Sequence, residues 1–139
     1  MRAMSRSIVV LILAGAAASA IGCSKDTEML AMATEFETFS NEIVKKVKTA
    51  PNPAVGVKAA QAYLDENKAR IRSRLAELKS VKNFQISDTT KKRIESSFTT
   101  GATAVAGLQL EYVGQMATDA AFRTAMEKLV QDYRSVVAD

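Results

Sequence analysis

The sequence predicts an all-α protein, an antiparallel up-down-up-down four-helix bundle that follows a cleaved N-terminal leader. The chain of 139 residues contains only 6 Gly and 2 Pro, and after the leader it has no runs of β-branched residues. Four stretches carry apolar residues three or four positions apart, which is the repeat of one helix face. The links between these stretches are short, so the four apolar stripes are expected to pack against each other as antiparallel neighbours.

The first helix is expected to begin near Asp26 or Thr27, both of which are capping residue types, and to end before Pro51-Asn52-Pro53. The second is expected from about Ala54 to Lys82, with Asn67 in a gap of its apolar stripe. The stripe of the first helix consists of Met29, Met32, Phe36, Phe39, Ile43 and Val47. The stripe of the second consists of Val57, Ala60, Leu64, Ile71, Leu75 and Leu78.

A connector at 83–87 is expected to place Phe84 and Ile86 over the end of the core, with Ser87 or Asp88 capping the third helix. Residues 114–118 are expected to break the pattern, with Thr118 or Asp119 capping the fourth helix. The third stripe consists of Ile94, Phe98, Gly101, Val105, Leu108, Tyr112 and Met116, and the fourth of Phe122, Met126, Leu129, Tyr133 and Val136. The alternative architecture is a three-helix bundle with the first helix partly detached.

The first 22 residues have the pattern of a secretory signal. Arg2 and Arg6 precede an uncharged apolar run at 8–21, and small residues follow. As a helix this run would span about 21 Å, against about 30 Å for the hydrocarbon core of a bilayer. A cleaved leader is therefore favoured over a permanent membrane anchor.

Two cleavage patterns overlap at the end of this leader. Ala18-Ser19-Ala20 fits ordinary signal cleavage, which would leave Cys23 as a free thiol. Ala20-Ile21-Gly22-Cys23 resembles the lipobox of bacterial lipoproteins, a resemblance that covers residues 1–23. It implies a diacylglyceryl group on the Cys23 thiol, cleavage before that residue and, usually, a further acyl chain such as palmitate on the new amine.

The cysteine count favours the second pattern. Cys23 is the only cysteine, and a lone thiol is unusual in an oxidising, exported compartment. The predicted organisation is a signal peptide at 1–22, a lipidated N-terminus and tether at 23–26, and a bundle at 27–139. By the same resemblance, Ser24 favours the outer membrane, with the bundle in the periplasm and the membrane contacted through the lipid on Cys23.

The residue types exclude most catalytic chemistry. The absence of His removes the usual ligands of bundle haem and di-iron sites and the usual base of a serine or cysteine nucleophile. The Met residues of the bundle lie on apolar stripes, where Met fills gaps. We expect a non-enzymatic binding, structural or assembly module without catalytic residues, metal or cofactor. The alternatives are a carrier of a small apolar ligand within the bundle and a hydrolase that uses Glu28, Glu35 and Glu42 or Asp65-Glu66 with water.

Charge is unevenly distributed along the chain. Removing Arg2 and Arg6 lowers the net charge from +4 to +2, and residues 43–93 alone carry +9 between acidic flanks. These basic residues either face an anionic partner or pair with acidic neighbouring helices. Nucleic acid is not expected as a partner, because no aromatic residues interleave the Lys and Arg.

The third helix contains a stretch without charge at 96–110 (SSFTTGATAVAGLQL). Thr99, Thr103, Ala106 and Leu110 lie away from its apolar stripe by helical geometry. Small uncharged residues permit close helix approach, so these four are candidates for contact with a protein partner of unknown identity. The alternative is a centrally buried helix rich in Ala and Gly.

Overall fold

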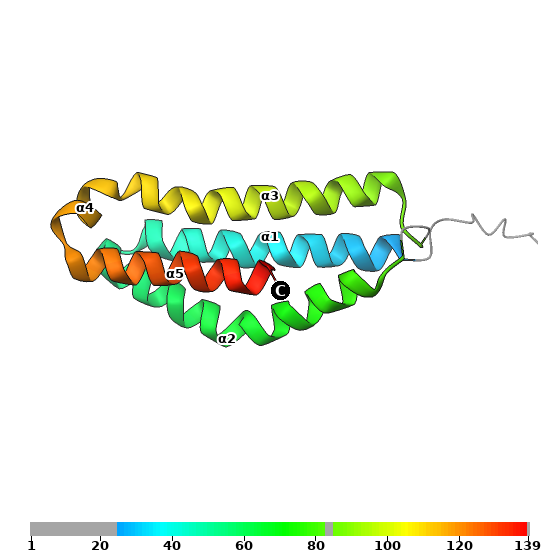
Figure 1. Cartoon of the computed structure of the whole chain (residues 1–139), viewed down its shortest axis with the longest axis horizontal. Coiled ribbons are helices and arrows are strands. Elements are labelled where there is room, and N and C mark those ends of the chain that lie inside the picture. Colours follow the sequence, from blue (N-terminus) through cyan, green and yellow to red (C-terminus); the bar gives the residue numbers. More distant parts are fainter. Residues whose placement is uncertain (1–24, 83–84, 139) are drawn as a thin grey trace, which may run out of the picture.

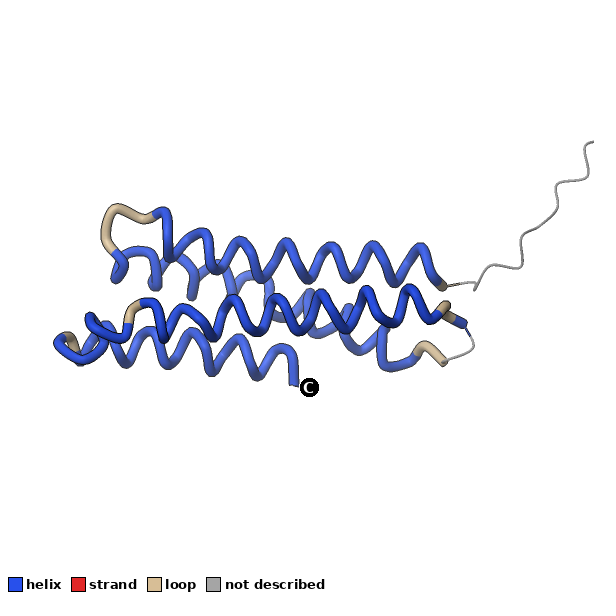
Figure 2. The backbone as a smooth tube through the Cα atoms, turned by 90° about the horizontal axis from the view of Figure 1, so that it is seen from above, coloured by secondary structure: helices blue, strands red, loops and turns tan. Residues whose placement is uncertain are grey.

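The computed structural model describes residues 25–82 and 85–138; these ranges contain α-helices, a 3₁₀ position at Gln85 and no strand. The helices are α1 (Asp26–Thr49), α2 (Pro53–Ser80), α3 (Asp88–Glu111), the short α4 (Val113–Thr118) and α5 (Ala120–Ala138). The four long helices run antiparallel along one axis, with α4 at the turn between α3 and α5 (Figures 1 and 2). The predicted four-helix bundle is therefore confirmed.

The arrangement of the helices places α1 in the middle of the fold. It packs against α2 on one side and α3 on the other, and α5 packs against α2 and, less closely, against α3. The alternative with a detached first helix is wrong, because eight residues of α1 are buried, from Met29 to Val47.

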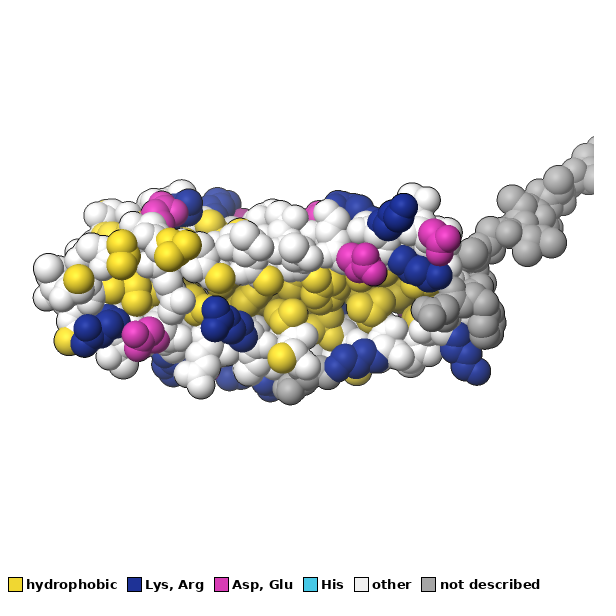
Figure 3. Space-filling model, turned by 45° about the horizontal axis from the view of Figure 1, so that its top comes forward, with side chains coloured by type: hydrophobic (Ala, Val, Ile, Leu, Met, Phe, Trp, Pro, Cys, Tyr) yellow, Lys and Arg dark blue, Asp and Glu magenta, His cyan; other side chains and the backbone are white. Residues whose placement is uncertain are grey.

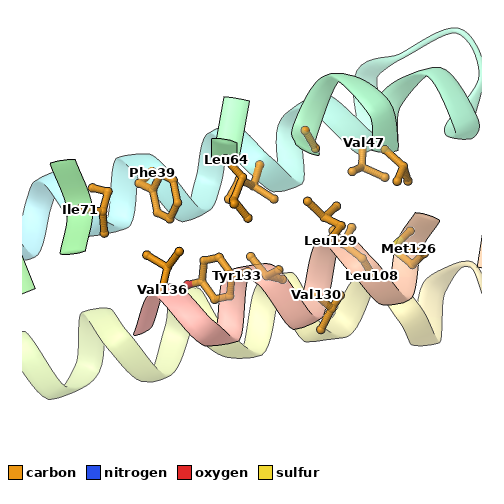
Figure 4. Packing of buried hydrophobic residues seen from close by; sticks show 14 of the residues in the cluster. Phe39, Val47, Leu64, Ile71, Leu108, Met126, Leu129, Val130, Tyr133 and Val136 are labelled. Carbon is orange, nitrogen blue, oxygen red and sulfur yellow. The ribbon is translucent and has the colours of Figure 1, made fainter. Parts of the chain in front are cut away.

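The main core is formed by the predicted stripes. Buried side chains from α1, α2, α3 and α5 point into one interior, as Figure 4 shows for Phe39, Leu64, Leu108 and Tyr133. A smaller cluster at the end where α1 begins consists of Met29, Met32, Ala33 and Ile94, with Leu78, Val81, Ile86 and Phe98 packed against it. Among the described residues, the buried members of both clusters lie between Met29 and Val136.

The smaller cluster has no contribution from α5. At about 1.5 Å per residue, the 19 residues of α5 span about 28 Å and the 28 residues of α2 about 42 Å. The C-terminus consequently lies well short of the end at which α1 begins (Figure 1). The fold has four helices over most of its length and three at that end.

The helix boundaries follow from local capping with two corrections. Asn52, Ser87 and Asp119 accept backbone N–H hydrogen bonds from Ala54 (2.8 Å), Thr90 (3.2 Å) and Phe122 (2.9 Å), as N-caps do. Asp26, in contrast, does not cap α1: the helix begins at Asp26 itself, one residue before the predicted bundle boundary. Its carboxylate instead accepts a hydrogen bond from the backbone N–H of Ser87 (2.7 Å).

The second correction concerns residues 114–118, which were expected to break the helical pattern. They belong to α4, so the chain turns through one short helix rather than a non-helical link. Gly114 lies within α4 and is exposed. A Cβ at this position would meet no described atom within 4 Å, so close packing does not require glycine here. The change of direction lies instead at Tyr112 and Asp119, the non-helical residues on either side of α4.

Two glycines allow unusually close helix approach. A Cβ at Gly101 would lie 2.6 Å from Ser40 Oγ and 3.1 Å from Phe36 Cε1, so α3 approaches α1 more closely than a larger residue permits. A Cβ at Gly56 would lie 2.7 Å from the carbonyl oxygen of Val47, where α2 turns back along α1. Gly101, a member of the predicted third stripe, is buried at this contact.

Along the middle of the bundle, the ribbon of α2 bows outward (Figure 1). Asn67 occupies the gap in its stripe and donates a hydrogen bond to the carbonyl oxygen of Tyr63 (2.8 Å). The ring of Phe39 stacks on the rings of Tyr63 and Tyr133, at centroid distances of 5.9 and 6.0 Å.

Candidate binding surfaces

Cys23 and the leader lie outside the described residues, so their predicted lipidation and cleavage are not addressed by the structure. The described residues begin at Lys25, two positions after Cys23. Within the described ranges, no helix has the length and apolar character needed to span a bilayer.

The four predicted contact residues lie in a line on α3, and we call them the α3 outer face. Thr99 and Thr103 are exposed, Ala106 is half-buried, and Leu110 is 79% exposed. Figure 3, which turns α3 toward the viewer, shows uncharged side chains along the middle of this side and charged ones mainly toward its two ends. The alternative of a centrally buried third helix is therefore wrong, because this side of α3 is exposed.

Three positions after Leu110, Val113 at the start of α4 is 62% exposed. Leu110 and Val113 are the two most exposed large apolar side chains of the described residues. Fully burying one such side chain is worth roughly 1.5–3 kcal/mol. Leu110 on the face and Val113 just beyond it thus offer two exposed apolar anchors.

The basic residues of α2 pair with neighbouring helices at several positions. Glu35 of α1 forms ion pairs with both Arg70 and Arg74, the second at 3.2 Å. The guanidinium of Arg72 donates to the side chain and backbone of Ser135 on α5 at 3.3 and 3.4 Å. The interpretation of the basic segment as pairing with its neighbours is confirmed at Arg70 and Arg74.

A further ion pair joins α3 to α1. Arg93 donates two hydrogen bonds to the carboxylate of Glu37, and the hydroxyl of Ser97 lies 2.9 Å from the same carboxylate. The hydrogen bonds from Arg93 hold the pKa of Glu37 below its usual value. Ser97 is fully buried, and its polar role was not predicted because an isolated Ser carries no periodic signal.

The carboxylate row proposed for acid–base work is separated into independent pairs. Glu28 binds Lys25 at 2.6 Å and Glu42 binds Lys45 at 3.1 Å, while Glu35 binds the two arginines of α2. Each carboxylate is thus engaged with a different cation. Among the described residues, no three His, Cys, Asp or Glu side chains come together in a way that could hold a metal ion.

A groove of about 490 Å³ lies between the first halves of α2 and α5. Its walls are mainly apolar. The lining residues are Ala54, Val57, Lys58, Gln61, Ala62 and Asp65 of α2, and Ala125 and Lys128 of α5. Most of them are exposed, so the groove opens on the surface rather than into the main core.

A polar network fixes one side of this groove. The amide nitrogen of Gln61 donates to Asp132 (2.8 Å) and to Asp65 (3.3 Å). The ammonium of Lys128 forms an ion pair with Asp132 and that of Lys68 with Asp65, and these hydrogen bonds hold the pKa of both carboxyl groups below its usual value. The amide oxygen of Gln61 is buried and has no hydrogen-bond partner among the described residues.

Sequence reasoning missed this groove. The spacings Gln61 to Asp65 and Lys128 to Asp132 are each four residues, which signals side-chain pairs on one helix face. The contact of Gln61 with Asp132 joins two helices, and no spacing within a single helix reveals it. Comparisons with protein-family models, curated proteins and solved structures gave no match.

Proposed function

We propose that the chain is a lipid-anchored protein of the bacterial cell envelope, with a non-enzymatic bundle that binds a protein partner through the α3 outer face. The observation that carries the binding part is the exposure of Leu110 in a helix face without charge. Elsewhere many charged residues of the bundle form ion pairs, some within one helix and some between helices. The anchor rests on the lipobox-like sequence that ends at Cys23.

The chemistry of the face favours a protein partner over an ionic ligand. It presents Thr hydroxyls, an Ala methyl group and the Leu110 side chain, none of which attracts an ion strongly. Small side chains let a partner helix approach closely, and the apolar anchors contribute through desolvation. An amphipathic helix laid along α3 would fit this surface.

The anchor is tested by labelling cells with radioactive palmitate. We expect incorporation into the wild-type protein and none into Cys23→Ser. Ordinary signal cleavage would give neither incorporation nor partition into the membrane fraction, and the anchor would then be abandoned whatever the bundle binds.

The binding face is tested by crosslinking intact cells and purifying the tagged protein. Ala106→Glu and Thr103→Lys place a charge on the face and should abolish the crosslinked complex while helical circular dichroism is unchanged. Ala76→Glu on α2 and Thr38→Lys on α1 are matched controls, because both sites are exposed and lie on other helices. A complex that survives both face variants would refute this assignment, and unfolding of both would show that the face serves the core.

A further inference from the structure

The groove between α2 and α5 has the properties of a small-molecule site. Such sites are typically clefts of about 300–1,000 Å³, mainly apolar, with a few fixed polar groups. The volume here is about 490 Å³. A groove of this volume can hold one short acyl chain against its walls.

The charge of the groove selects the sign of the ligand. Three ionised residues line it: Lys58, Asp65 and Lys128. Asp65 is neutralised by Lys68, and Lys128 is neutralised by Asp132. Lys58 has no ion-pair or hydrogen-bond partner in the described part of the chain, so the groove holds one uncompensated positive charge.

The polar network determines where the ligand can be held. The amide nitrogen of Gln61 already donates to two carboxylates, so it is not available to an acidic head group. The ammonium of Lys58 is the free donor of the lining, and Ala54, Val57 and Ala125 supply apolar wall. A ligand therefore needs an apolar body and one negative group.

We propose that this groove binds a small single-chain amphipathic carboxylate, with its chain against the alanine walls of α2 and α5 and its head at Lys58. This site is separate from the α3 outer face and does not depend on the proposed partner or on the anchor. It also differs from the predicted carrier role, because the ligand lies on the outside of the bundle rather than within it.

The test is titration of the ¹⁵N-labelled chain from residue 23 onward with octanoate, followed by NMR. We expect a Kd in the low millimolar range, as suits a ligand of this size, with shifts confined to residues around the groove. Octylamine, which has the same chain and the opposite charge, should bind more weakly. Equal binding of octylamine, or the absence of octanoate binding, would overturn the proposal.

Two variants with matched controls locate the site. Ala125→Leu fills the groove from an exposed position and should weaken octanoate binding at least about tenfold, whereas Ala59→Leu, exposed on α2 outside the lining, should not change it. Lys58→Gln should weaken binding about two- to fivefold, the range for one exposed charge pair, and Lys79→Gln should have no effect. Unchanged binding in Ala125→Leu, or shifts concentrated at core residues, would place the ligand elsewhere and refute this site.

Discussion

Because α3 lies close to α1 at Gly101, replacing glycine by alanine should affect the free energy of unfolding differently at Gly101 and at Gly107, two positions of α3. Replacing Gly by Ala in a helix normally stabilises it by about 1 kcal/mol, because Ala loses less backbone entropy on folding. Gly107 has open space where a Cβ would lie, so Gly107→Ala should show this gain in full. At Gly101, the new methyl group would lie 2.6 Å from Ser40 Oγ and 3.0 Å from Ser40 Cβ.

Forcing a methyl group into a packed core typically costs about 1–3 kcal/mol. After the gain from helix propensity, Gly101→Ala should change stability by about 0 to 2 kcal/mol in the destabilising direction. The two variants should therefore differ by about 1–3 kcal/mol in the free energy of unfolding. For a bundle of this size, that corresponds to roughly 4–15 °C in Tm.

Urea unfolding followed by circular dichroism at 222 nm measures both variants against wild type. A Gly101→Ala variant that gains as much stability as Gly107→Ala would refute the close approach of α3 to α1. The double variant Ser40→Ala/Gly101→Ala gives a second check. It removes the nearest atom, Ser40 Oγ, so the added methyl group should cost less in that background than in wild type.

Two further predictions follow from buried contacts. Gly56→Ala should lower the free energy of unfolding by about 1–3 kcal/mol, because its Cβ would lie 2.7 Å from a backbone oxygen that cannot rotate away. Urea unfolding measures this change. A neutral effect would contradict the tight turn between α1 and α2. Burial raises the pKa of Tyr133 to about 12, despite its hydrogen bond with Ser40 (2.8 Å), so the folded state holds this proton more tightly than the unfolded chain. Stability due to Tyr133 should be complete below pH 10 and decline between about pH 10 and 12, and Tyr133→Phe should reduce that decline in unfolding measured as a function of pH. A decline of the same size in Tyr133→Phe would assign it to other groups.

The fold was predictable because its core follows helical periodicity closely. In α1 and α5, every residue of the predicted stripes is buried, and the stripes of α2 and α3 fail only where a side chain lies at the edge of the core, such as Leu78 and Phe98. Capping by Ser87 and Asp119 was also predictable, because it depends on residues two or three positions apart. Val130, buried beside the fourth stripe, was missed because a minimal 3-4 repeat is narrower than the face that α5 buries.

Contacts between helices were largely beyond the sequence. The role of Asp26 illustrates this: its residue type and position suggest an N-cap, but its partner is the backbone of Ser87, 61 residues away. The same holds for the hydrogen bond of Gln61 with Asp132 and for the groove that these residues border. Helical geometry left two alternatives for the α3 outer face, an exposed contact surface or a buried helix. Only the packing of α3 in the structure decides between them.

The hydrogen bonds between the first turn of α1 and the connector before α3 affect how the bundle responds to a pulling force. The backbone N–H of Lys25 donates to the carbonyl oxygen of Gln85 (3.1 Å), next to the bond between Asp26 and Ser87. Any tension that reaches the bundle through residues 1–24 is applied at this point. A pulling force there acts on α1 and on the connector that precedes α3, so the first turn of α1 can unwind only if these two hydrogen bonds break or the start of α3 moves with it.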